Sequence, residues 1–159
     1  MLFRSLDDAN DGATDISGDV VTLSAATGIG ASAGAGSLDT AANSITAAVT
    51  GAGLINLNEA NAVTLASVST ANGSITITTG GTTVIGSVSS ATDADANDIS
   101  ITASSGDIVV GTVNAGTTAG DVTLTATAGA ILDDANDGAT DISGDVVTLS
   151  AATGIGASA

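Results

Sequence analysis

One segment of this chain occurs twice without a single substitution. Residues 6–33 read LDDANDGATDISGDVVTLSAATGIGASA, and the same letters return at residues 132–159, an offset of 126 residues. Self-similarity at a fixed period is typical of repeat architectures, in which each unit buries its apolar face against the next. We therefore divide the chain into a leader at residues 1–5, one full repeat at residues 6–131 and the start of the next repeat at residues 132–159. We expect it to be part of a longer tandem array.

A shorter period lies inside the long one. Six segments share the order apolar, Thr or Ser, apolar, and they begin 23 to 30 residues apart. They are residues 21–23, 45–47, 75–77, 99–101, 122–124 and 147–149. Alternation at period two predicts β-strands with one buried face. The spacing predicts that each long repeat contains five rungs of about 25 residues.

Aligning the six segments predicts two columns of inward side chains. The first contains Val21, Ile45, Ile75, Ile99, Val122 and Val147, and the second contains Leu23, Ala47, Ile77, Ile101, Leu124 and Leu149. A second strand position recurs at residues 63–68, 83–88 and 108–113, where Ala or Gly in fourth place predicts a corner. Because a unit of this length cannot bury its apolar face alone, we predict an all-β chain folded as a parallel β-solenoid of about six rungs with open ends.

The composition excludes several classes of protein. The chain has 17 acidic residues and one basic residue, Arg4, for a net charge of −16. Nucleic acids and anionic lipids need a basic footprint, so we expect neither as a partner. No apolar run is long enough to insert into a membrane as a helix, and without cysteine there is no disulfide or thiolate metal site. The 43% of hydrophobic residues, in strict alternation, argues against disorder.

Three stretches carry a resemblance to a known family. They read GDVTLTATAG at residues 120–129, GIGASAGAGSLDTAANSITA at residues 28–47 and NEANAVTLASVSTANGSITI at residues 58–77. In this order they resemble the repeat region of filamentous-haemagglutinin-like adhesins, which are large bacterial surface proteins of the two-partner-secretion type. The resemblance implies a right-handed parallel β-helix that serves as an extracellular stalk or adhesive fibre on the bacterial cell surface. The sequence departs from the family pattern in lacking its N-terminal secretion head.

The two copies of LDDANDGATD are the candidate metal sites. Their carboxylates belong to Asp7, Asp8, Asp11, Asp15, Asp133, Asp134, Asp137 and Asp141. Carboxylate oxygens are ligands for calcium, but an EF-hand is excluded because Ala9 occupies one ligand place and Gly18 stands where a bidentate Glu belongs. Two interpretations stay open, a looser calcium site and a solvated turn rich in Asp and Asn. The fold requires no cofactor, and calcium is the one candidate.

Acidic residues also precede equivalent strands at Asp98, Asp121 and Asp145. Stacking is expected to place neighbouring carboxylates about 5 Å apart. Like charges at that distance repel each other by about 1 kcal/mol in water. Solvation and salt, or a bound cation, would relieve this repulsion.

The residues expected of an enzyme are scarce. Parallel β-helix lyases need Lys, Arg or His as a base, and this chain has only Arg4, outside the repeat. Asp133 and Asp134 are adjacent on a loop, which is a poor geometry for the two carboxylates of a glycosidase. We therefore expect no enzymatic activity.

The favoured function is that of a structural segment in a large extracellular surface fibre. The expected partner is the chain itself, by head-to-tail stacking, with residues 145–159 accepting residues equivalent to 34–43 of another copy. A host or surface ligand is the second expected partner. The alternative function is a calcium-dependent binding module that uses the acidic loops.

Overall fold

The computed structural model describes residues 12–31, 36–135 and 137–158, which form strands and no helix. The strands are β1 (Ile16–Ala25), β2 (Leu38–Ala52), β3 (Ile55–Glu59), β4 (Val63–Asn72), β5 (Ile75–Thr79), β6 (Thr83–Ser90), β7 (Ile99–Ala103), β8 (Ile108–Asn114), β9 (Val122–Ala126), β10 (Ala130–Asp133), β11 (Ile142–Ser143), β12 (Val147–Ala151) and β13 (Gly154–Ser158). In this part of the chain, no helix is present that could cross a membrane.

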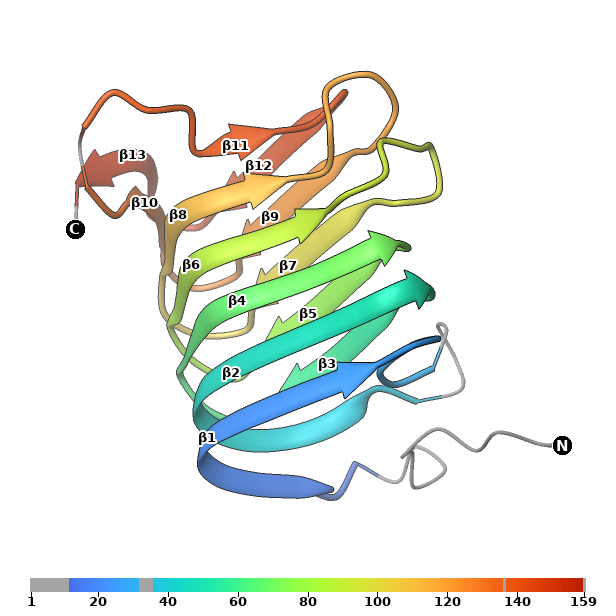
Figure 1. Cartoon of the computed structure of the whole chain (residues 1–159). Coiled ribbons are helices and arrows are strands. Elements are labelled where there is room, and N and C mark those ends of the chain that lie inside the picture. Colours follow the sequence, from blue (N-terminus) through green and yellow to red (C-terminus); the bar gives the residue numbers. More distant parts are fainter. Residues whose placement is uncertain (1–11, 32–35, 136, 159) are drawn as a thin grey trace, which may run out of the picture.

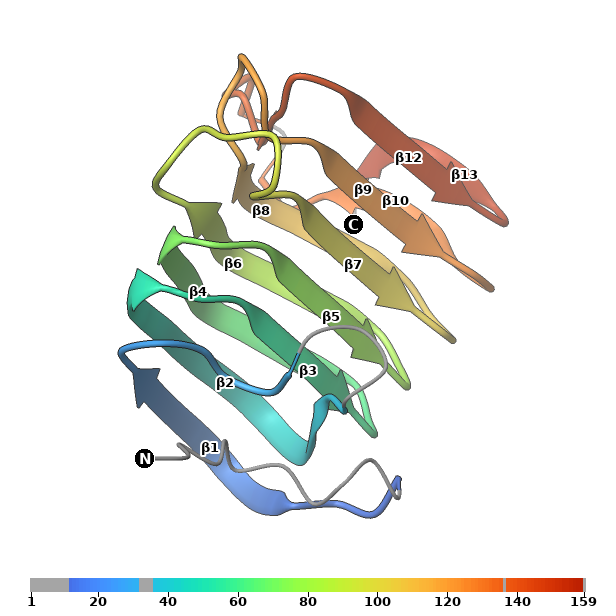
Figure 2. The same cartoon turned by 90° about the vertical axis from the view of Figure 1, so that its right-hand side faces the viewer.

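The strands coil into a parallel β-solenoid with two facing layers (Figure 1). The front layer contains β1, β2, β4, β6 and β8, and is continued by β10, β11 and β13; the back layer contains β3, β5, β7, β9 and β12. Figure 2 shows the layers from the side. The chain runs to the right in front and to the left behind while it climbs, so the coil is right-handed (Figure 1). The predicted fold, with about six turns, is confirmed.

One turn takes 20 to 25 residues. In the back layer the residues that pair in register are Ile55, Ile75, Ile99, Val122 and Val147. In the front layer they are Val21, Ile45, Leu65, Ile85 and Val110. Most of these side chains point between the layers and are fully buried, so the core is a set of aliphatic columns along the solenoid axis.

The predicted alignment of the columns was wrong in its first two members. Val21 and Ile45 lie in the front layer beside Leu65, whereas Ile75 and Val122 lie in the back layer. Both layers bury alternate residues, so the pattern of Val, Thr and Leu fits either layer equally well. The spacing of 30 residues between Ile45 and Ile75 therefore covers one and a half turns and not one long rung.

The predicted second strand position is confirmed. Residues 63–68, 83–88 and 108–113 pair in register in the front layer. In β8 the fourth place has no room for a side chain, because a Cβ at Gly111 would lie 2.5 Å from the carbonyl oxygen of Ile85. Gly is required here by the close approach of two backbones.

The two identical segments occupy different layers. Val21 lies in the front layer, while its repeat equivalent Val147 lies in the back layer. In each copy the strand is followed by a crossing to the opposite layer, since Ile29 bridges to Ile55 behind and Ile155 pairs with Ile131 in front. The 126 residues between Val21 and Val147 therefore cover five and a half turns where the sequence predicted five.

Candidate functional site

The second copy of the acidic loop joins β10 to β11 at the C-terminal end of the solenoid. The Oδ1 atom of Asp133 accepts a hydrogen bond from the backbone N–H of Ala135 at 3.1 Å. The Oδ1 atom of Asp137 accepts one from Ala139 at 2.7 Å. Both carboxylates close short turns of the kind that Asp favours, which supports the solvated-turn interpretation.

The carboxylates of this loop repel one another. The pKa of Asp141 is raised by desolvation and by the charges of Asp133, Asp137 and Asp134. In the described part of the chain, however, no three carboxylates are grouped so that they could hold a metal ion. Calcium binding by Asp133, Asp134, Asp137 and Asp141 stays a prediction.

The described part of the first copy of the loop, residues 12–15, lies at the opposite end of the solenoid. Asp7, Asp8 and Asp11 fall outside the described residues, whereas Asp15 precedes β1. The Oδ2 atom of Asp15 accepts a hydrogen bond from the N–H of Asp39 at 2.9 Å, and the N–H of Asp15 donates to the carbonyl oxygen of Asp39 at 2.8 Å. The structure thus ties Asp15 to β2 and does not bring it near its equivalent, Asp141.

A second carboxylate that the sequence analysis missed lies beside Asp15. Asp39 is buried, and its Oδ1 atom accepts hydrogen bonds from the side chains of Asn58 at 2.7 Å and Ser37 at 3.3 Å. Its Oδ2 atom is buried and has no hydrogen-bond partner among the residues that the structure describes. An unpaired buried carboxylate oxygen is costly, and a bound cation is one way to satisfy it.

The acids that precede the strands are hydrogen-bond acceptors between turns. The Oδ1 atom of Asp98 accepts from the N–H of Asp121 at 3.0 Å, and that of Asp121 accepts from Val146 at 3.1 Å. Asp107 accepts in the same way from Ala130 at 2.8 Å. The predicted stacking is confirmed for Asp98 and Asp121, because Ile99 pairs with Val122. It was wrong for Asp145, because Val147 pairs with Val122 and so brings Val146 beside Asp121. The sequence indicated repulsion between these carboxylates, relieved by solvation, salt or a cation. The backbone N–H of the following turn supplies a partner that a list of charges does not reveal.

Asp93 makes the densest contacts of any carboxylate in the described structure. Its two oxygens accept hydrogen bonds at 2.9 to 3.1 Å from the backbone N–H groups of Thr117, Thr118, Ala119 and Gly120. These donors, above all Gly120 and Thr117, lower the pKa of Asp93 to about 2. A Cβ at Gly116 would overlap the Asp93 carboxylate, so the loop can wrap around it only with Gly there.

Glu59 is a fully buried carboxylate at the end of β3, at the corner that leads to β4, and it pairs with Thr40 of β2. It accepts hydrogen bonds from the hydroxyl of Thr40 at 2.8 Å and from the backbone N–H groups of Ala42 and Asn61 at 3.0 to 3.1 Å. Alternation with Ile55 and Leu57 already placed Glu59 on the inward face, so this residue could have been found from the sequence. Its contacts hold this corner of the coil together.

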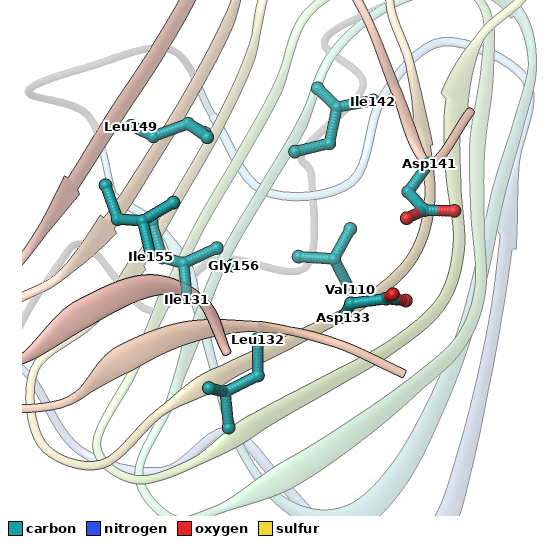
Figure 3. Close-up of a pocket in the computed structure, with 9 residues that line it drawn as sticks. All are labelled: Val110, Ile131, Leu132, Asp133, Asp141, Ile142, Leu149, Ile155 and Gly156. Atoms are coloured by element: carbon teal, nitrogen blue, oxygen red, sulfur yellow. The ribbon is translucent and has the colours of Figure 1, made fainter. Parts of the chain in front are cut away.

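The C-terminal end of the core is open. A hollow of about 140 Å³ lies between β8, β10, β11, β12 and β13 (Figure 3). Its walls are apolar and include Val110, Ile131, Ile142 and Leu149, with the carboxylates of Asp133 and Asp141 at the rim. Ile155 also lines it and is 52% exposed. The hollow is the cross-section of the core, exposed where the described turns end.

Both ends of the solenoid also present strand edges. Within the described ranges β1 pairs only with β2, β12 only with β9 and β13 only with β10. Such edges are templates for pairing with another chain.

No family model, no curated protein and no solved structure matches this chain. The resemblance to adhesins therefore rests on the sequence motifs alone.

Proposed function

We propose that this chain is a structural segment of an extracellular bacterial surface fibre, in which stacked turns act as a stalk or a self-assembling filament. The observation that carries the proposal is the apolar hollow at the C-terminal end, bordered by the free edges of β12 and β13. An end of this kind is matched by another turn of the same solenoid. The placement outside the cell follows from the resemblance to surface adhesins.

The roles of the acidic side chains support a structural function. Asp93, Asp98, Asp107, Asp121 and Glu59 all accept hydrogen bonds from neighbouring turns or corners. In the described residues these carboxylates hold the coil together, which leaves them poorly suited to acid–base chemistry. Parallel pairing along the axis then gives a rod whose length grows with each added turn.

Electron microscopy and fibre diffraction of the 159-residue chain test this function. We expect fibres with a strand spacing of about 4.8 Å along the fibre axis, formed more readily as salt screens the charge of −16. A chain that stays monomeric at every salt concentration, or a strand spacing across the fibre, would contradict the proposal.

A matched pair of variants separates end contacts from general effects of charge. Ile155→Lys places a cation in the hollow, whereas Thr102→Lys makes the same change in charge on the outward face of β7. We expect the first variant to remain monomeric and the second to form fibres. Equal assembly of both would show that the open end is not the contact.

The second candidate function is calcium-dependent binding, which the unpaired Oδ2 atom of Asp39 beside Asp15 favours. Calorimetric titration should then show calcium uptake, and calcium should raise the melting temperature by mass action. Asp39→Asn should abolish both effects, while Asp95→Asn, on an exposed loop, should leave them intact. The absence of heat and of any melting shift at millimolar calcium would remove this candidate.

A further inference from the structure

We propose that the duplicated segment is a strand-exchange joint between chains. When two chains meet end to end, residues 138–151 of one chain take the place of the identical residues 12–25 of the next chain beside β2. The partner is a second copy of this chain, and the docking surface is the edge of β2. The inference rests on the proposed self-assembly. It specifies that β12 of one chain pairs with β2 of the next chain and that β1 of the next chain is displaced.

Each copy of the segment uses a different edge. β1 binds β2 through nine paired positions, and β12 binds β9 through five. β2 lies above β1, whereas β9 lies below β12 (Figure 1). Because the two sequences are identical, the free edge of β12 is the edge with which β1 binds β2. The free edge of β1 is likewise the edge with which β12 binds β9. In a continuous solenoid, a single copy of the segment can therefore pair with β9 of one chain through one edge and with β2 of the next chain through the other.

The charges favour a joint that keeps one copy. If both copies stayed, β12 would pair with β1 in register, and Asp145 would stack on Asp19 and Asp141 on Asp15. Like charges directly opposite each other destabilise a pair of strands. With one copy, the residue equivalent to Asp19 meets Asn43, whose side-chain amide donates to Asp19 at 2.7 Å. The residue equivalent to Asp15 meets the backbone N–H of Asp39 at 2.9 Å.

The apolar residues give the same answer. Val21 is 6% exposed beside Ile45, while its equivalent Val147 is 42% exposed. Ile29 is 5% exposed at its bridge to Ile55, while its equivalent Ile155 is 52% exposed. Identical side chains thus have a burial site on β2 and β3 that they lack at the C-terminal end. Docking on the next chain would supply that site and close the hollow.

The exchange itself is nearly balanced. The incoming segment makes the same contacts with β2 that the departing segment gives up, because every side chain is the same. What is gained is a paired edge on β12 and a covered core end. Exchange of an identical element between protomers is a low-cost route to assembly, and a head-to-tail joint of this kind continues without closing.

Disulfide trapping tests the joint, because the chain has no cysteine of its own. Ser24 pairs with Ala48 in the front layer, and the repeat equivalent of Ser24 is Ser150, which pairs with Thr125 in the back layer. Paired strands lie about 4.8 Å apart, within reach of a disulfide. In the double variant A48C/S150C the two thiols are far apart within one chain, so only the proposed joint brings them together. We expect a ladder of disulfide-linked multimers on a non-reducing gel.

Two further variants separate the joint from simple stacking. S24C/A48C should lock β1 on β2 when oxidised and block fibres until a reductant is added. S24C/S150C should give no ladder, since those positions meet only if both copies are retained. Fibres of the locked chain, or a ladder from S24C/S150C, would overturn the strand exchange and leave the fibre function standing. Failure of the unmodified chain to assemble would overturn both proposals.

Discussion

Carboxylates in this protein find their partners in backbone N–H groups. The one basic residue of the chain, Arg4, lies outside the described residues, and the described residues include no Lys or Arg that could neutralise an acid. Asp93 instead accepts four backbone N–H groups of the next loop, and Glu59 binds N–H groups at a buried corner. A carboxylate that accepts several such bonds is held in its charged form.

The depressed pKa of Asp93 gives a prediction on pH. Because its folded pKa is about 2 and its ordinary value is 3.8, its contribution to stability is complete above pH 3.8 and is lost as the pH falls through about 2. Asp93→Asn should therefore lower the melting temperature at pH 7, and the difference from the unmodified chain should vanish near pH 2. Thermal melts across this range check it, with Asp95→Asn as a control of equal charge change. A difference that persists unchanged at pH 2 would count against the role of the charge.

Glu59 gives a prediction on buried hydrogen bonds. Glu59→Ala leaves the hydroxyl of Thr40 and the N–H groups of Ala42 and Asn61 without their acceptor. We expect the free energy of unfolding to fall by about 3 kcal/mol, since each unsatisfied buried group costs about 1–3 kcal/mol. Urea denaturation measures this change. Glu59→Gln, which keeps one acceptor oxygen, should cost less, and an equal loss for both would point to shape as the cause.

At the scale of the strand, the sequence carries the direction of each side chain but not the layer to which the strand belongs. The alternation around Ile101 and Ile77 predicted inward and outward faces, and these residues are buried as expected. The same alternation could not place Val21 and Ile45, because the front and back layers bury the same kinds of residue. The layer is set by pairing with the neighbouring turn, which is a property of the folded coil.

The faces of one strand can be tested by placing a charge on each in turn. Ile101→Asp puts an unpaired carboxylate between Ile77 and Leu124 in the core. We expect this to cost several kcal/mol of unfolding free energy. Thr102→Asp, on the outward face of the same strand, should cost far less. Denaturant unfolding of the two variants gives the comparison, and similar losses would contradict the assignment of faces.

The candidate sites could be predicted from the sequence only in part, because stacking of the turns brings together residues that are far apart in the sequence. The acidic repeat identified Asp15 and Asp141, but it could not show that the solenoid holds them at opposite ends. The contact of Asp93 with the loop that ends at Gly120 joins residues more than a full turn apart, and no local motif marks it. The alternation of apolar and polar residues predicted which side chains face the core. It did not predict the hydrogen bonds that one turn makes with the next.

At the scale of the whole molecule, a repeat of five and a half turns would give a fibre built through the proposed joint a two-fold screw axis. At about 4.8 Å per turn, each chain added through this joint would lengthen the fibre by about 26 Å and would be rotated by half a revolution relative to the chain before it. The loop that contains Asp93 would then lie on one side of the fibre in one chain and on the opposite side in the next chain. Gold particles attached at Asp95→Cys should therefore alternate along the two borders of the fibre, with about 53 Å between particles on the same border. Both borders would present the same loops at half the density, so neither side of such a fibre is privileged for contact with a surface.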